Sequence, residues 1–439
     1  MRFLYLLLKI VTNYSLRIYY PRILKINSPK AYFGRTIYVS NHPSSFMDPI
    51  VIGGLQRPSV FFMTRSDVFT PLMKPILWLA QMLPIYRQLD GEGALSKNNE
   101  VFRSCATVLI RGRNLLIFGE GFTDDVFIRR IKPIKKGAAR IGFGALESMK
   151  WKKKVYLAAI GINYGDPQYL QSDLVISNSA KICLNDYKDL YIENPNRAVV
   201  EVTKQIESLL KAQLVHIDNA DWEPFHAMIL RLRRNGLHPV NTDFNISLLQ
   251  RFENTKQLAL WLNKQDLNSP SLICLNESLK SYFDHLTQLN IKEEYVYEYA
   301  IKGKLSLFKP LLFLFFTWPF FILGIIHLSL PYLFVKKFTE AKFKRAVFWS
   351  SVKMVLGMLV MTLFNWPIMI LLNKLFFHSV YVSWIYFLIL PIVGLITYLF
   401  IRNLSDLLSR RMTSIGMLNP LVRQRTELIE LLNQHLSNL

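Results

Sequence analysis

The chain has 439 residues, which is enough for two or three domains with cores of their own. About half of the residues are hydrophobic, yet the formal net charge is +22. A soluble enzyme seldom combines these properties, so the composition favours a protein that lies in a bilayer and meets anionic head groups or phosphorylated substrates. The sequence has no zinc-finger spacing, basic region with heptads or RNA-binding aromatic motif, so we expect no nucleic-acid partner.

The cysteines Cys105, Cys183 and Cys274 are scattered and odd in number. They provide neither a disulfide framework nor the ligand spacing of a metal site. We therefore expect three buried thiols in a reducing compartment and no bound metal.

Residues 1–30 are expected to form a membrane-interface segment, with an amphipathic helix over residues 1–25. Apolar residues such as Phe3 and Leu7 are interspersed with Lys9 and Arg17. Because Lys9 interrupts the apolar run and no small-residue cleavage site follows, a helix lying on an anionic leaflet is favoured over a signal peptide. The alternative is an ordinary surface helix packed on the next domain.

Residues 31–215 alternate apolar extended runs with helical stretches, which predicts an α/β domain. The expected strands are 36–39, 59–63, 114–118, 155–162 and 173–178, and the expected helices lie around 45–55, 70–82, 97–112 and 137–149. Solidly apolar strands indicate a mostly parallel sheet flanked by helices on both faces. Sites in such sheets lie at the carboxyl ends of the strands, where His42, Arg87 and Glu120 fall.

The remainder of the chain is predicted to be helical. Residues 216–305 form a polar accessory region, 306–405 a membrane region and 406–439 a cytoplasmic helical tail. Within the membrane region the segments 310–335, 354–377 and 380–401 are each long enough to cross a hydrocarbon core of roughly 30 Å.

Charge predicts the membrane topology. Lys336–Arg345 and the tail arginines are both expected on the cytoplasmic side of the cell (inner) membrane, together with the active site. A single crossing by 310–335 would place Lys336–Arg345 outside. We therefore expect this segment to be a re-entrant hairpin broken at Pro319, Gly324 or Pro331, followed by a helical hairpin that turns at residues 378–379.

A candidate general base follows the first predicted strand. His42 comes directly after it, and Asp48 lies six positions later. A strand can fix an imidazole, while a carboxylate holds its tautomer and stabilises the imidazolium. Pro43 disfavours a regular helix from His42, so the turn 43–47 must bring Asp48 within hydrogen-bond reach. The alternative is a structural histidine with no catalytic role.

Four blocks in a fixed order extend this signal. They are Asn41–Pro49, Leu83–Arg87, Ile117–Gly121 and Ala158–Tyr164, with Ile134–Ile141 between the last two. Together they resemble the glycerolipid acyltransferase family, which includes glycerol-3-phosphate and lysophosphatidic acid acyltransferases, over roughly residues 1–215.

The resemblance implies a membrane-bound O-acyltransferase of phospholipid synthesis. Such an enzyme moves a fatty acyl group from a thioester, either acyl-CoA or acyl carrier protein, to a hydroxyl of glycerol-3-phosphate or lysophosphatidic acid. It implies no resident cofactor. The expected partners are the thioester, the glycerophospholipid precursor, membrane lipids and acyl carrier protein.

The resemblance also suggests roles for individual residues. His42 is the expected base and Asp48 its partner; Arg87 grips the acceptor phosphate by bidentate contacts. Glu120 and Gly121 form an acceptor-binding block, and Lys136 binds phosphate or the donor's phosphopantetheine. The alternatives are structural ion pairs for Arg87 and Glu120, and a solvated helix start for Lys136.

Two departures from the family pattern stand out. Five residues separate His42 from Asp48 instead of four, which looks like a bacterial branch of the family. Phe122 and Thr123 follow Glu120-Gly121 where the family commonly has Thr-Arg. The missing arginine leaves room for another acceptor, such as a different lysolipid or an amino-acid lipid, and for transacylation. A non-catalytic membrane scaffold is the alternative outside the enzymes.

Overall fold

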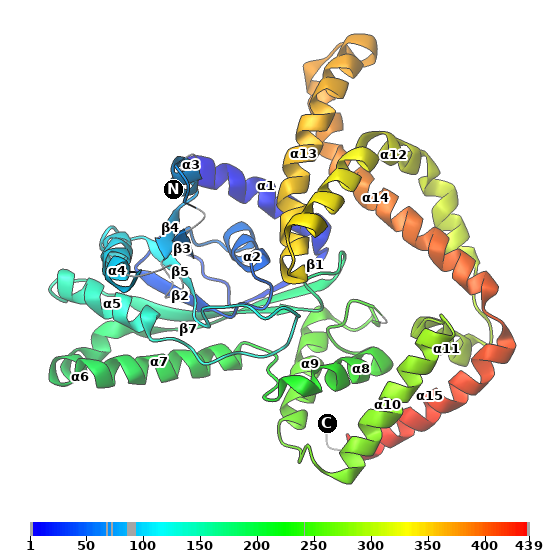
Figure 1. The fold of residues 1–439 in the computed structure, drawn as a ribbon, viewed down its shortest axis with the longest axis horizontal. Helices are drawn as coiled ribbons and strands as arrows, with labels where there is room; N and C mark the ends of the chain where they lie inside the picture. The colour runs from blue at the N-terminus through cyan, green and yellow to red at the C-terminus, as the bar shows by residue number, and fades with distance from the viewer. Residues whose placement is uncertain (1–2, 67–68, 72, 86–93, 241, 437–439) are drawn as a thin grey trace. The chain divides into compact units, whose positions relative to one another are not determined.

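The computed structural model describes residues 3–436 except 67–68, 72, 86–93 and 241. The chain divides into two compact units, Met1–Ala220 and Asp221–Leu439. The first unit contains the sheet, and the described part of the second unit is helical (Figure 1). The finer boundaries expected near residues 30, 305 and 405 stay predictions.

The first unit is built on a seven-stranded sheet with the order β1-β7-β6-β2-β5-β3-β4. Its strands are β1 (Arg22–Ile26), β2 (Thr36–Ser40), β3 (Val60–Arg65), β4 (Met82–Ile85), β5 (Asn114–Phe118), β6 (Tyr156–Tyr164) and β7 (Asp173–Cys183). All neighbouring strands run parallel except β6 and β7. The predicted mostly parallel sheet is therefore confirmed, and the sequence interpretation missed only the short strands β1 and β4.

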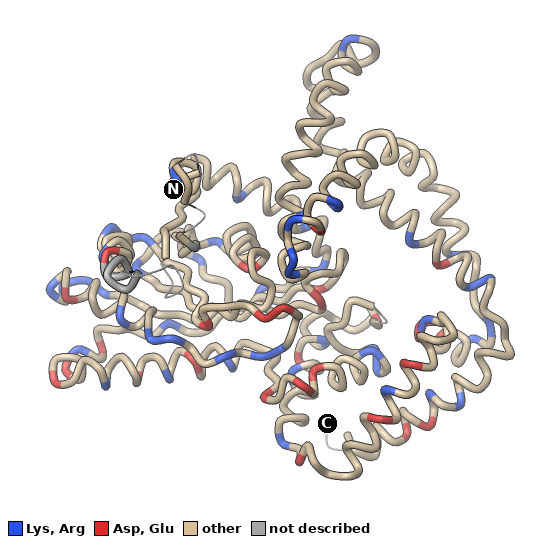
Figure 2. The backbone as a smooth tube through the Cα atoms, in the orientation of Figure 1, with Lys and Arg blue, Asp and Glu red and all other residues tan. Residues whose placement is uncertain are grey.

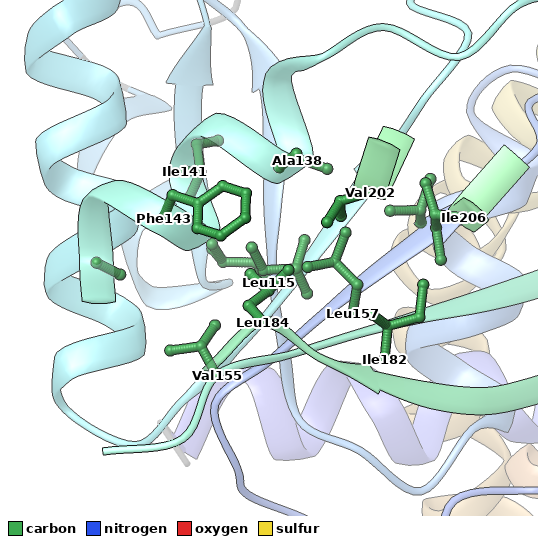
Figure 3. Close-up of a cluster of buried hydrophobic side chains, with 14 of the residues drawn as sticks. Leu115, Ala138, Ile141, Phe143, Val155, Leu157, Ile182, Leu184, Val202 and Ile206 are labelled. Atoms are coloured by element: carbon green, nitrogen blue, oxygen red, sulfur yellow. The ribbon is translucent and has the colours of Figure 1, made fainter. Parts of the chain in front are cut away.

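Helices cover the sheet and create the core of this unit. They are α1 (Phe3–Tyr19), α2 (Met47–Leu55), α3 (Met73–Leu79), α4 (Ala94–Ile110), α5 (Gly137–Ser148), α6 (Lys188–Glu193) and α7 (Pro195–Ala212). The main buried cluster joins α4, α5 and α7 to alternate residues of the strands, including Ile37 and Val39 of β2. Figure 3 shows part of this cluster, with Leu115 of β5 and Leu157 of β6 among its residues. Because strand side chains alternate between faces, Tyr38 points to the opposite face.

The N-terminal helix is shorter than expected. A helix over residues 1–25 was predicted, but α1 ends at Tyr19, and Arg22–Ile26 pairs with β7 as the edge strand β1. Pro21 explains the end, since the residue before a proline is disfavoured in helical conformation. The helix is also partly packed on the domain, because Leu16 is fully buried.

The cysteines differ from expectation as well. Cys105 is buried and Cys183 is half-buried, but Cys274 on α10 (Pro270–Gln288) is exposed. The prediction of three buried thiols was therefore wrong for Cys274, because it lies on the solvent face of an amphipathic helix. All three thiols are free.

The second unit contains a helical bundle and a group of long apolar helices. The bundle helices are α8 (Glu223–Arg233), α9 (Leu248–Leu262), α10 (Pro270–Gln288), α11 (Glu293–Lys302) and α15 (Ile415–His435). Although α15 follows the apolar helices in the chain and α10 and α11 precede them, α15 packs against both. The fully buried Glu293 accepts from Arg425 Nε at 2.6 Å across this contact.

The apolar helices are α12 (Phe308–Lys342), α13 (Trp349–Leu372) and α14 (Val380–Met412), with a short π-helical turn, Asn373–Phe377, after α13. α12, the stretch Ala346–Phe377 and α14 are each long and apolar enough to cross a membrane. All three predicted membrane segments are present, and each is longer than expected. The last one runs past residue 401 into the predicted tail.

The expected break in 310–335 is absent, since α12 is one continuous helix with Pro319 and Pro331 inside it. A proline at 331 removes the N–H that would have bonded to the carbonyl of His327, four residues earlier. Asn365 of α13 supplies the missing donor, with its Nδ2 3.2 Å from that carbonyl. Neighbouring helices commonly satisfy freed backbone groups in this way, so the helix bends without breaking.

Candidate active site

His42 lies two residues beyond the carboxyl end of β2, and its ring is fixed by Asp48. The imidazole Nδ1 is 2.8 Å from Asp48 Oδ2. The hydrogen bond predicted across the five-residue spacing is therefore present. Because Nδ1 is engaged, Nε2 is the ring nitrogen that can take a proton from a substrate, and the side chain is 20% exposed.

An irregular turn makes this contact. Ser45 has a positive φ of 48°, and the backbone N–H groups of Met47 and Asp48 bond to the carbonyls of Ser44 and Ser45. α2 therefore begins at Met47, and Asp48 lies in its first turn. The turn absorbs the extra residue, as expected from Pro43.

Asp48 is fully buried and accepts from groups other than His42. The backbone N–H of Ser44 donates to Oδ2 at 2.9 Å, and the hydroxyl of Tyr164 donates to Oδ1 at 2.9 Å. Burial raises the pKa of the Asp48 carboxyl, while these hydrogen bonds oppose the rise. The carboxylate is thus held in one orientation by donors on both of its oxygens.

Glu120 and Phe118 approach His42 from the neighbouring strand. The ring of Phe118, the last residue of β5, stacks on the imidazole with centroids 4.1 Å apart. The carboxylate of Glu120 accepts from the backbone N–H of His42 at 2.9 Å. Burial raises the pKa of the Glu120 carboxyl. This carboxylate therefore holds the start of the catalytic turn in place.

Strand order explains the convergence. In the sheet, β2 lies between β6 and β5 and is parallel to both. Tyr164 ends β6, His42 follows β2 and Glu120 follows β5, so all three reach the same edge. This edge is where ligands bind in parallel α/β sheets.

An open groove of about 460 Å³ adjoins Glu120. Several of the side chains that line it are cationic: Arg130, Lys132, Lys135 and Lys211. Asp124 pairs with two of them, at 3.0 Å from Lys132 Nζ and 3.5 Å from Arg130. The groove is therefore a largely cationic surface beside Glu120, which suits an anionic ligand.

Gly121 fits the backbone to this groove. Its φ is +79°, a left-handed conformation that favours glycine. A Cβ at this position would also lie 2.6 Å from Lys135 Nζ, so the lysine side chain passes directly over the glycine. A larger residue at 121 would displace Lys135 as well as strain the turn.

Of the predicted ligand-binding residues, Lys136 does not line the groove, and one other cannot be placed. Arg87 lies outside the described residues. Lys136 is exposed at the N-terminal end of α5, whereas the neighbouring Lys135 lines the groove. The geometry of His42, Asp48, Glu120 and Gly121 agrees with a single site, while their roles stay predictions.

Tyr164, Lys132 and Lys135 were missed as functional residues. The sequence could have pointed to Tyr164, because this residue ends the strand of the fourth sequence block and therefore lies at the same sheet edge as His42. Nothing in the sequence pointed to Lys132, since it lies in a loop whose path depends on the tertiary fold. Among the described residues, no three His, Cys, Asp or Glu side chains gather as a metal site requires.

Comparison with known proteins gives a family for the first unit. Residues 24–162 match the family model described as Acyltransferase, and this range includes His42, Asp48 and Glu120. The crystal structure of the 1-acyl-sn-glycerophosphate (LPA) acyltransferase, PlsC, from Thermotoga maritima matches with a TM-score of 0.31 and 15% sequence identity, over 46% of this chain and 79% of that chain. Comparison with curated proteins finds no significant match.

Proposed function

We propose, on the premise that residues 24–162 match the family model described as Acyltransferase, that the protein transfers a fatty acyl group from a thioester to a hydroxyl of a glycerophospholipid precursor. The acceptor we propose is lysophosphatidic acid or glycerol-3-phosphate. The observation that carries the proposal is the His42–Asp48 hydrogen bond at the catalytic edge of a family-matched domain. The donor is acyl-CoA or an acyl carrier protein.

In this mechanism His42 acts as the general base. A glycerol hydroxyl is a weak nucleophile, so His42 Nε2 removes its proton as the oxygen attacks the thioester carbonyl. Asp48 stabilises the imidazolium that forms, and the thiolate leaves with the proton returned to it. Positioned general-base catalysis is worth on the order of 10²–10⁴-fold in rate. No covalent acyl-enzyme is needed.

The acceptor phosphate is assigned to the cationic groove beside Glu120. Lys132 and Lys135 take over the role of the arginine that the third block lacks, and Lys211 also lines the groove. Lysine binds phosphate as a point charge, whereas arginine grips it bidentately. We assign Glu120 a positioning role, because its carboxylate holds the backbone of His42.

The protein's apolar surfaces supply a route for lipid substrates. The outer face of α1 exposes large apolar side chains, among them Phe3 at 81% and Ile10 at 60%. A helix of this kind lies in a membrane interface. The apolar helices α12 to α14 add a firm attachment, so lysolipid and acyl chains reach the site without crossing water.

The test is an acyl-transfer assay on the detergent-solubilised full chain. Labelled acyl-CoA and acyl carrier protein are each offered with lysophosphatidic acid, glycerol-3-phosphate, a phosphate-free monoacylglycerol and a lysophospholipid with a zwitterionic head group. We expect transfer to a phosphate monoester and a loss of at least 10²-fold in kcat for His42→Ala. Unchanged transfer by His42→Ala would overturn the proposal.

The acceptor panel also tests the second candidate function, which is acyl transfer to another lysolipid. The missing arginine favours this function. Lys132→Met and Lys135→Met should raise KM for the phosphate monoester by about tenfold or more, because each removes a charge-assisted contact of ~1.5–3 kcal/mol. The matched control is Lys136→Met, an exposed lysine outside the groove. Preference for the zwitterionic acceptor, with KM unmoved by either groove variant, would select the second candidate.

A further inference from the structure

Beyond the proposed function, we propose a membrane topology for the second unit. α13 and α14 cross the bilayer as a hairpin, while α12 enters the bilayer, bends and returns to the side from which it came. Both flanks of the apolar region then lie on one side of the membrane.

The first argument comes from the two flanks. Lys292, at the start of α11, is 2.8 Å from Asp406 near the end of α14, and Tyr295 also donates to Asp406. Arg410, one turn further along α14, lies 2.5 Å from Glu298 of α11. Residues on either side of the apolar region thus form one ion-pair network, which three complete crossings would separate by the thickness of a membrane.

The buried pair between Glu293 and Arg425 extends this network into α15. Removing one partner of such a pair is costly because the other charge stays buried, so this contact joins the flanks firmly. An even number of crossings follows. One of the three apolar helices therefore does not cross from end to end.

The contacts of α12 identify it as the helix that returns. Its first half runs antiparallel to α14: Phe321 stacks on Phe400 with centroids 4.2 Å apart, and Leu328 lies beside Gly394. Between these points Gly324 touches Thr397, closer than a side chain would allow. Along this half, α12 rises toward the tip of the hairpin.

The second half of α12 contacts α13 in the opposite direction. His327 Nδ1 is 2.7 Å from Asn365 Oδ1, and Glu340 is 2.7 Å from Lys353, near the start of α13. The ring centroids of Trp366 on α13 and Trp384 on α14 are 5.7 Å apart, so these two helices form a hairpin. Along this half, α12 therefore descends, away from the tip of the hairpin. The bend in the middle of α12 is visible in Figure 1.

Charge agrees with this path. Lys374 is the one Asp, Glu, Lys or Arg residue between positions 354 and 401, and the hairpin is drawn almost entirely tan in Figure 2. The link between α12 and α13, in contrast, carries the basic cluster Lys342, Lys344 and Arg345. A returning α12 leaves this cluster on the same side as Arg410 and Arg411, as the positive-inside rule favours.

The test is labelling of single cysteines with a membrane-impermeant maleimide, in right-side-out and inside-out vesicles. The background variant is Cys183→Ser/Cys274→Ser. Its one remaining cysteine, Cys105, is buried, so this variant without a probe gives the background labelling. The probes are Lys304→Cys before α12, Lys344→Cys after α12, Ser379→Cys at the hairpin tip and Ser414→Cys after α14.

We expect positions 304, 344 and 414 to label from one side and 379 from the other. Labelling of 304 together with 379, opposite to 344 and 414, would mean that α12 crosses, and labelling of all four from one side would mean that no helix crosses; either overturns the topology. Resistance to carbonate extraction checks that each variant is inserted. The result is independent of acyl transfer, so failure here leaves the proposed function intact.

Discussion

At the scale of single residues, the site depends on donors that hold one carboxylate. Asp48 is fully buried and takes hydrogen bonds from His42, the Ser44 backbone and Tyr164. Burial of a carboxylate costs free energy that these donors offset. Asp48 can therefore stabilise an imidazolium without moving, at the expense of stability in the resting protein.

The raised pKa of Asp48 gives a pH prediction. Because its folded pKa lies above the unfolded value, the stabilising contribution of this group is fully present below the unfolded pKa and is lost as pH rises through the folded pKa. The thermal midpoint of the wild type should therefore fall relative to that of Asp48→Asn as the pH rises from about 4, the pKa of an aspartate in an unfolded chain, through the higher folded pKa. Melting curves of both proteins measure the difference, and a constant difference would contradict the prediction.

Tyr164→Phe tests the orientation of the carboxylate. The change removes the hydroxyl that donates to Asp48 Oδ1 and keeps the aromatic ring. A hydrogen bond to a charged group is worth ~1.5–3 kcal/mol, so kcat should fall by roughly tenfold or more. The acceptor KM should stay within about twofold, because the hydroxyl contacts Asp48 and not the groove. Tyr156→Phe on the same strand is the control and should leave kcat unchanged.

At the scale of elements, prolines and their partners decide how helices run. Pro21 follows the end of α1, and the chain continues as β1. Pro331 does not end α12, because Asn365 donates to the carbonyl of His327. The same residue type therefore breaks one helix and bends another, according to what lies beside it.

This contact gives a prediction for α12. Asn365→Leu should destabilise the second unit by about 1 kcal/mol, because the carbonyl of His327 loses its donor in an apolar setting. Pro331→Ala restores a backbone N–H to that carbonyl, so the effect of Asn365→Leu should shrink in the Pro331→Ala background. Thermal unfolding of the single and double variants in detergent forms the double-mutant cycle. Additive effects would show that Asn365 does not compensate for the proline.

At the scale of the whole molecule, the net charge of +22 and the apolar helices are related in their placement. Positive charge gathers at the flanks of the apolar region, and buried ion pairs join these flanks to each other. The bundle therefore couples the two flanks, since α15 follows the apolar helices in the chain and packs against α10 and α11, which precede them.

Arg425→Met tests this coupling. It leaves the fully buried Glu293 without its cation, which should destabilise the bundle by about 3–5 kcal/mol. Limited proteolysis of α15 and thermal unfolding in detergent should both detect the loss. Arg425→Met/Glu293→Gln removes both charges and should recover much of the stability. Equal destabilisation by the single and double variants would contradict a role for the charge pair.

Local chemistry settled much of this protein from the sequence alone. Solid apolar strands between helices identified the parallel sheet, and long uncharged runs identified the membrane helices. His42 and Asp48 could be paired because a strand end and a short turn bring them together, whatever else the chain does. These features depend on contacts between residues that are close in sequence.

Long-range packing decided the rest. The sequence did not reveal that Tyr164 would bond to Asp48, because this depends on β6 lying beside β2. Nor did it place Lys132 and Lys135 in the groove, since a loop's path is fixed by what it packs against. The continuity of α12 through Pro331 likewise required a donor from another helix. Each of these outcomes is a contact across many residues, and only the tertiary structure could supply it.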